Sequence, residues 1–159
     1  MSADFPSLDS PNVRRSSPAP DELAQRVAGV MTAWRAAIQQ RDPETVTRLD
    51  LTFRDAPERY EAALVESAKS DADERVRAFS TRVLGKLRLP ELADTFRALL
   101  ADPSPYVRQN AAWALGELAG ASEGRAPNRA ALASLERLRA SDPDGDVRAE
   151  ARSALERLR

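Results

Sequence analysis

The sequence predicts an all-α protein and, within that class, an α-solenoid: a stack of about four antiparallel helix pairs. Ala, Leu, Arg and Glu dominate the composition, and these residues are strong helix formers. Apolar residues recur at helical spacing, whereas the alternation typical of strands is rare. A segment of 17 residues also occurs three times along the chain. Tandem copies of this kind indicate stacked supersecondary units.

The three copies align without a gap and begin at Asp71, Asp102 and Asp142. In each copy Val-Arg lies at offsets 5 and 6 from the Asp, and Leu lies at offsets 13 and 16. The copies read DADERVRAFSTRVLGKL, DPSPYVRQNAAWALGEL and DPDGDVRAEARSALERL.

One face of each copy is predicted to form the core, because offsets 5, 9, 12, 13 and 16 coincide on a helix. Small residues at offsets 9 and 12 let neighbouring helices approach closely. Gly85 and Gly116, both at offset 14, are expected to mark close backbone contacts, and Glu156 replaces them where the stack ends. In the second copy the core residues are Val107, Ala111, Ala114, Leu115 and Leu118.

The N-terminal part begins with a Pro- and Ser-rich stretch over 1–20, which is predicted to be a disordered tail. Asp21 is a suitable N-cap for a helix over 22–40, in which Trp34 is predicted to be a core residue. Asp42-Pro43 then begins a shorter helix that reaches Phe53. We interpret 21–56 as a degenerate N-terminal capping repeat, since one face of a cap meets water.

Prolines mark the helices that precede the copies. Pro57 begins a helix to about Ser70, and Pro90 begins the next one. An insertion over 121–128 widens the spacing between copies, and a helix over 129–140 follows it. The repeats are therefore predicted at 57–88, 89–120 and 121–159, and 21–159 forms a single domain of eight helices.

The composition limits the function. With 24 basic and 25 acidic residues the formal net charge is −1, so charge alone does not make this a polyanion binder. The absence of Cys and His excludes thiol nucleophiles, zinc fingers and imidazole chemistry, and we expect no cofactor and no metal. No apolar run approaches the ~20 residues that cross a membrane. We expect a cytoplasmic protein without membrane contact, because residues 1–20 lack the apolar core of a signal peptide.

The Asp at offset 0 and the Arg at offset 6 are interpreted as structural residues. An Asp before Pro suits a turn and a helix N-cap. Since one Asp and one Arg occur per unit, we expect a ladder in which each Arg bridges to an Asp side chain or a loop carbonyl. Its members are Asp71, Arg77, Asp102, Arg108, Asp142 and Arg148.

The second copy resembles a HEAT repeat, specifically the short bacterial HEAT-like type named after phycobilisome lyases. The acidic turn, the Val-Arg pair, the small residues and the Ala-Leu-Gly-x-Leu ending carry the resemblance, which covers about 57–159. It implies a right-handed superhelix whose second helices line a concave surface. Relatives of this kind are mostly interaction modules, some belong to bilin lyases, and distant ones are DNA glycosylases.

Offsets 4, 8, 11 and 15 lie on the helix face away from the core, and we predict that this stripe binds a partner. Exposed aromatic residues beside Arg are typical of binding hot spots. The alternative is that Trp113 packs into its neighbouring repeat and that the charges are only a solvated face. The predicted partner-binding residues are Arg75, Phe79, Arg82, Lys86, Tyr106, Asn110, Trp113, Glu117 and Glu150.

The predicted function is a non-catalytic adaptor that binds a peptide or helical segment of another protein, as a monomer or weak homo-oligomer. One alternative is nucleic-acid binding through the Arg-rich first copy, with Tyr106 and Trp113 stacking on bases. The other is a lyase-like or glycosylase-like enzyme subunit with Glu117, Glu150 or Asp146 as the acid. The sequence contains no phosphate-binding loop and no nucleophile elbow, so we do not expect the protein to be an enzyme.

Overall fold

The computed structural model describes residues 19–120 and 129–158. The insertion over 121–128 and the predicted tail, apart from its last two residues, lie outside the described residues. The described part contains eight α-helices, one 3-10 helix and no strand. In chain order the helices are α1 (Pro20–Gln40), α2 (Pro43–Asp55), α3 (Pro57–Ser70), α4 (Glu74–Leu87), η1 (Pro90–Leu92), α5 (Ala93–Leu99), α6 (Pro105–Gly120), α7 (Arg129–Ser141) and α8 (Gly145–Arg157).

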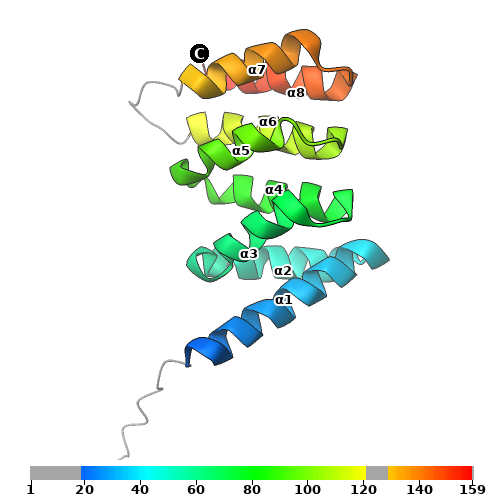
Figure 1. The fold of residues 1–159 in the computed structure, drawn as a ribbon, viewed down its shortest axis with the longest axis vertical. Helices are drawn as coiled ribbons and strands as arrows, with labels where there is room; N and C mark the ends of the chain where they lie inside the picture. The colour runs from blue at the N-terminus through cyan, green and yellow to red at the C-terminus, as the bar shows by residue number, and fades with distance from the viewer. Residues whose placement is uncertain (1–18, 121–128, 159) are drawn as a thin grey trace, which may run out of the picture.

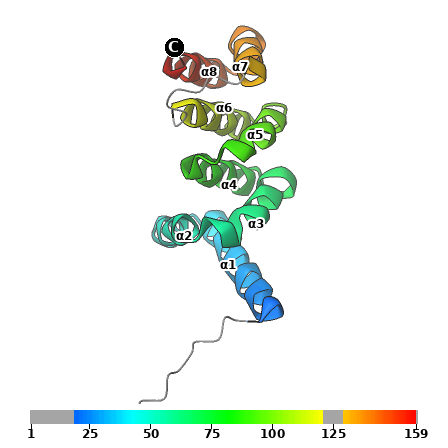
Figure 2. The same ribbon diagram turned by 90° about the vertical axis from the view of Figure 1, so that its left-hand side faces the viewer.

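The helices form four pairs that stack in chain order, which confirms the predicted all-α solenoid (Figure 1). Figure 2 shows two layers, with α2, α4, α6 and α8 on one side and α1, α3, α5 and α7 on the other. The helix α1 lies obliquely at one end of the stack, and α7 and α8 lie at the other (Figure 1). None of the helices in the described residues is long and apolar enough to cross a membrane.

Proline begins most helices, because its fixed φ angle suits the first turn and its missing N–H is not needed there. The α1 helix starts at Pro20, one residue before Asp21. Asp21, predicted as the N-cap, therefore lies in the first turn of the helix. Asp42 caps α2 by accepting a hydrogen bond from the backbone N–H of Thr45 at 3.1 Å. Pro90 begins a 3-10 turn rather than an α-helix, so α5 is short.

The predicted core face is buried in all three copies, except that Leu87 and Leu158 at offset 16 are only partly buried. Val76, Val107 and Val147 at offset 5 are fully buried, as are the alanines at offsets 9 and 12 of the second and third copies. In the first copy Ser80 occupies offset 9 and is also buried. Its hydroxyl is satisfied there, because the Trp34 indole donates a hydrogen bond to it at 3.2 Å. The predicted core position of Trp34 is correct, since its side chain is 1% exposed.

The glycines at offset 14 lie where neighbouring units meet most closely. A Cβ atom on Gly85 would lie 2.6 Å from Trp113 Cζ3 and 2.8 Å from Ala114 Cβ. A Cβ atom on Gly116 would lie 3.0 Å from Ala154 Cβ. The backbones of α4 and α6, and those of α6 and α8, therefore approach each other closely at these glycines. The sequence predicts such close contacts where small residues lie between helices.

The helix α8 lacks the small residues that α4 and α6 have at offsets 10 and 14. At offset 10 Thr81 and Ala112 are buried, whereas Arg152 at that offset of α8 is exposed. At offset 14 Glu156 replaces glycine and is also exposed. This face of α8 is therefore charged and exposed to solvent, unlike the same face of α4 and α6.

Replacing Gly85 with Ala is expected to destabilise the protein by about 1–3 kcal/mol, because the new methyl group overlaps Trp113 and Ala114. The matched control is Gly29→Ala in α1, where nothing lies within 4 Å of the new Cβ. That control should gain up to about 1 kcal/mol from helix propensity. Urea unfolding measures both, and an equal gain at the two positions would contradict the close contact between α4 and α6.

Candidate functional site

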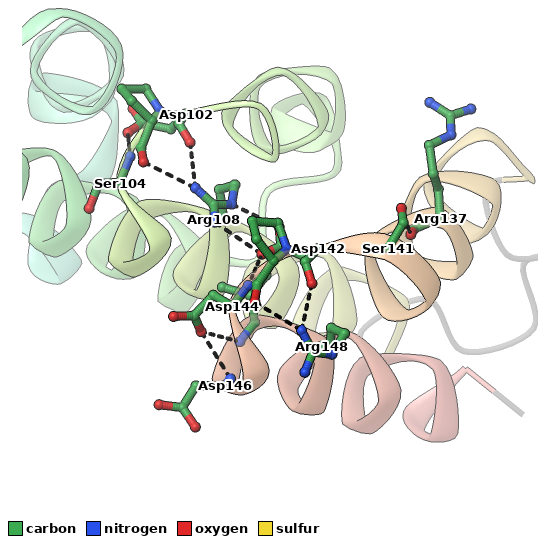
Figure 3. Close-up of polar contacts among 12 residues, drawn as sticks. Asp102, Ser104, Arg108, Arg137, Ser141, Asp142, Asp144, Asp146 and Arg148 are labelled. Atoms are coloured by element: carbon green, nitrogen blue, oxygen red, sulfur yellow. Dashed lines mark hydrogen bonds and ion pairs between the residues drawn. The ribbon is translucent and has the colours of Figure 1, made fainter.

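Arginine forks join successive units of the stack. Arg77 donates from Nε and Nη2 to the two carboxylate oxygens of Asp102, both at 3.0 Å. Its Nη1 donates to the backbone carbonyl of Asp71 at 2.8 Å. Arg108 repeats the pattern one unit later, with Asp142 as its carboxylate and Asp102 as its carbonyl (Figure 3). Each Arg therefore ties its own turn to the next one.

The Asp residues at offset 0 shape the turns but do not cap the helices. Each accepts a hydrogen bond from the backbone N–H two residues later, at 2.9 Å for Asp71, 2.8 Å for Asp102 and 2.9 Å for Asp142. The N-caps of α4 and α8 are Asp73 and Asp144, two positions further on. The predicted N-cap role of the offset-0 Asp is therefore wrong, because its carboxylate serves the turn and the neighbouring Arg.

The two ends of the ladder differ from its middle. At the N-terminal end Arg35 of α1 lies 3.3 Å from the Asp71 carboxylate, so the first rung comes from α1 rather than from α2. At the C-terminal end Arg148 donates from Nη1 to the carbonyls of Asp142 at 2.6 Å and Pro143 at 3.1 Å. Arg148 forms no ion pair within the described residues.

The forks are shielded from solvent and shift the ionisation of their members. Burial disfavours the charged form of Asp142, but hydrogen bonds from Arg108 and from the Asp144 N–H outweigh it, so the pKa of Asp142 lies below its ordinary value. The hydrogen bonds to Asp102 and Asp142 raise the pKa values of Arg77 and Arg108. The carboxylates of Asp102 and Asp142 are thus paired within the protein, which favours a structural role for these residues.

Large apolar side chains are exposed on the layer of even-numbered helices. Phe79 of α4 is 42% exposed and Tyr106 of α6 is 59% exposed, and they lie on neighbouring helices. The only other exposed large apolar residue in the described part is Leu51 of α2. Two of the three therefore occur in the predicted stripe, at offsets 8 and 4.

Two hollows flank Phe79, and we call them together the α4 groove. The first, of about 480 Å³, lies between α4 and α6. The second, of about 420 Å³, lies between α4 and the turn joining α1 to α2. Both hollows include Arg75 and Phe79 in their walls, so they adjoin at these two residues of α4. The remaining lining residues are Glu74, Ala78, Arg82, Tyr106 and Asn110 in the first, and Ala37, Ile38, Arg41, Asp42, Pro43, Val46 and Thr47 in the second.

Trp113 supports the groove without lining it. Its ring lies in close contact with Gly85 and is half-buried between α4 and α6. The guanidinium carbon of Arg82 lies 4.9 Å from the centre of the ring, which is cation–π geometry. Trp113 is thus partly inter-repeat packing and partly a platform that positions Arg82.

Most charges of the predicted stripe are neutralised within the protein. Lys86 lies 2.6 Å from Asp50, Arg88 lies 2.6 Å from Glu117, and Arg157 lies 3.0 Å from Glu150. Arg75 pairs with Asp73 at 3.1 Å, and its hydrogen bond lowers the pKa of that carboxyl. Lys86, Glu117 and Glu150 do not line the groove, and each is held in an ion pair. Among the stripe's cations, only Arg82 forms no ion pair within the described residues.

The groove also includes residues that the sequence analysis missed. Ile38, Pro43 and Val46 come from the first helix pair, where the repeat pattern is degenerate. A signal was present, since Val46 lies at offset 4 from Asp42, the offset of Arg75 and Tyr106 in their copies.

The candidate acids of the enzyme hypothesis do not converge. Glu117 is paired with Arg88 and Glu150 with Arg157, while Asp146 is exposed in the first turn of α8. Within residues 19–120 and 129–158 no group of three or more acidic side chains is placed to hold a metal ion.

These features define a class: helical-repeat scaffolds built from stacked helix pairs. The family model for HEAT repeats matches residues 61–156, more than half of the chain, so the chain belongs to the HEAT-repeat family. A comparison with curated proteins finds no sequence match.

A solved structure, the complex of CpcE and CpcF of phycocyanin lyase from Nostoc sp. PCC7120, is similar to this chain. The TM-score is 0.64 at 22% sequence identity, and the similarity covers 85% of this chain and 79% of the other. At this level of identity the similarity shows a shared fold.

This similarity corrects the expectation that the chain is not an enzyme. That expectation rested on missing catalytic motifs and on a repeat architecture that offers surface. The same architecture occurs in a phycocyanin lyase complex, so it does not separate binding modules from subunits of enzymes.

Replacing Asp142 with Asn should destabilise the protein by about 3 kcal/mol at pH 7, because Arg108 is left without its carboxylate in a buried site. The pKa of Asp142 is lowered in the folded protein, so its contribution is complete above the unfolded-state pKa of about 4 and is lost as pH falls through the folded value. Urea unfolding at a series of pH values should show the wild-type advantage shrinking below pH ~4.

Asp146→Asn is the matched control for this prediction, since it makes the same change at an exposed position two residues after the α8 N-cap. Its effect should stay within about 0.5 kcal/mol. Equal losses from both substitutions would show that the fork does not stabilise the stack.

Trp113→Ala should cost about 2 kcal/mol of unfolding free energy, because the ring fills the space beside Gly85. Tyr106→Ala, on the same helix face but largely exposed, should change stability by less than about 0.5 kcal/mol. Thermal and urea unfolding of the two variants test the assignment, and a neutral Trp113→Ala would place the indole at the surface.

Proposed function

We propose that this HEAT-repeat chain is a scaffold that binds a segment of a partner protein in the α4 groove. The observation that carries the proposal is the pair of adjoining hollows on either side of the exposed Phe79 ring. A hollow that spans neighbouring helices suits a chain segment laid across them. Exposed aromatic side chains beside an Arg are the composition of interface hot spots.

The floor of the groove is rigid, which favours binding because little side-chain entropy is lost. Phe79 packs edge-on against Trp34, with ring centres 6.3 Å apart. Trp34 packs in the same way against Phe53 at 5.0 Å, and Phe53 against Tyr60 at 5.2 Å. An aromatic column thus connects the groove to the core of the first two helix pairs.

The extent of the apolar core is relevant to the domain limits that we propose. One apolar core includes residues from Trp34 of α1 to Leu155 of α8, which supports 21–159 as a single domain. We propose that 21–56 acts as its capping repeat and that 57–88, 89–120 and 121–159 are the remaining repeats. The capping repeat would then have a second role, since α1 and α2 supply one wall of the groove.

Nucleic-acid binding receives less support. Of the six cations grouped around the first copy, five have a carboxylate partner within the protein, and only Arg82 lacks one among the described residues. The five pairs are Arg75–Asp73, Arg77–Asp102, Lys86–Asp50, Arg88–Glu117 and Arg97–Asp94. Phosphate groups bind most readily to cations that have no carboxylate partner. This surface has few such cations, so it is poorly suited to nucleic acid.

A second candidate function is that of a subunit in a lyase-like complex, with the groove holding a protein substrate or a second subunit. The similarity in fold to the CpcE and CpcF complex of phycocyanin lyase favours it. This candidate is compatible with the first, because in both the chain binds a protein. The identity of the bound chain separates them.

Site-specific photo-crosslinking tests the groove. A benzophenone side chain replaces Tyr106 at its edge, and the matched control carries it at Ala62, an exposed position of α3 in the other helix layer. In cells, adducts should form from position 106 and not from position 62. Mass spectrometry of the adduct then shows whether the partner is an enzyme subunit, an enzyme substrate or neither. Equal adducts from both positions would contradict a site in the α4 groove.

A further inference from the structure

Building on the proposed function, we infer the chemistry of the bound segment. The geometry points to an extended segment that carries an apolar side chain and, three residues away, a carboxylate. The apolar side chain enters the hollow beside α1 and α2, and the carboxylate pairs with Arg82.

The hollow beside α1 and α2 selects an apolar side chain. Ile38, Pro43 and Val46 line it on one side, and Phe79 lines it on the other. Two of the three charged groups in its wall have partners, whereas the third, Arg41, is exposed. Asp42 accepts the N–H of Thr45, and Arg75 is paired with Asp73. An apolar side chain that fills this hollow removes its own surface and that of Phe79 from water, which is favourable.

Arg82 is the cation best prepared for a carboxylate. Its guanidinium lies on the Trp113 ring, so its orientation is restricted before any ligand arrives. The one polar contact that it forms within the described residues is long, 3.4 Å from Nη1 to the Asn110 amide oxygen. A carboxylate accepts two hydrogen bonds from a guanidinium edge and gives a stronger, charge-assisted interaction. Exchange of the weak amide contact for a carboxylate is therefore favoured.

The other charges near Arg82 do not oppose this arrangement. Lys86, one turn later on α4, is paired with Asp50, and Glu117 of α6 is paired with Arg88. Glu74 lines the same hollow but lies eight residues before Arg82, about 12 Å along the helix axis. The end of the groove near Arg82 is therefore positive, and its opposite end is close to neutral.

The spacing of the two features sets the spacing in the partner. The apolar hollow lies on the α2 side of α4, and Arg82 reaches toward Trp113 of α6, so the segment crosses about one helix spacing, 8–10 Å. An extended chain in the polyproline II conformation advances about 3.1 Å per residue and completes one turn every three residues. Three residues therefore cover about 9 Å and bring the side chains at positions i and i+3 to the same face of the segment, in either chain direction.

Selection from a random peptide library against the full chain tests the inference. We expect enriched peptides to carry an apolar or aromatic residue and an Asp or Glu separated by two positions. Against Arg82→Gln the acidic position should lose its enrichment while the apolar position remains. The matched control is Arg152→Gln, a change of the same charge at an exposed position of α8, and it should leave the selected pattern unchanged.

A synthetic peptide from the selection gives the quantitative test by fluorescence anisotropy. Its affinity should fall about tenfold when its acidic residue is changed to the amide, and no further fall should occur in Arg82→Gln. A fall of equal size in Arg82→Gln would show that the carboxylate pairs elsewhere and would overturn the inference. Circular dichroism confirms that the exposed Arg82 can be replaced without unfolding the protein.

The remaining outcomes separate the inference from the proposed function. Peptides that bind the wild type but not Phe79→Asp, with no acidic position among them, would overturn the inference and leave the groove as the site. Peptides that bind Phe79→Asp as well as the wild type would place the binding surface elsewhere and overturn both. Failure to enrich any peptide would overturn the inference, because it requires a linear segment.

Discussion

The fork that each Arg at offset 6 makes with the next Asp at offset 0 is the constraint on which the stack depends. Apolar packing between helices is non-directional and tolerates sliding, whereas a bidentate guanidinium–carboxylate pair fixes both distance and orientation. Arg77–Asp102 and Arg108–Asp142 are almost fully shielded, with the Asp142 side chain only 4% exposed. Since each of these Arg residues also holds the carbonyl of its own turn, one side chain sets the register between two units.

That register makes the close packing possible, and the close packing in turn shapes the groove. Gly85 lies against Trp113 because α4 and α6 are held at one relative height, and Trp113 then supports Arg82 at the surface. On the other side of α4 the first rung comes from Arg35 of α1. The first helix pair therefore sits differently from the others, and the hollow beside Pro43 and Val46 lies at this irregular junction.

The repeat pattern predicted the features that recur in every unit. Val107 and Leu115 are buried as the offsets require, and Gly85 marks a close contact. The pattern could not predict features that depend on how units face one another. Lys86 pairs with Asp50, 36 positions away, and Arg88 with Glu117, 29 positions away. A stripe that appears charged in one copy is therefore largely neutralised in the folded protein, apart from Arg82. The groove wall from Val46 was not predicted because its copy is degenerate.

The column of rings beneath Phe79 gives the protein an optical property of its own. The chain has two tryptophans, and each lies one contact below a different half of the groove: Trp34 beneath Phe79, and Trp113 beneath Arg82. Trp34 is enclosed by aromatic rings, whereas Trp113 is half-exposed beside a cation, so their emission environments differ. The molecule thus carries two native, spectrally distinct reporters, one for each hollow, without any added label.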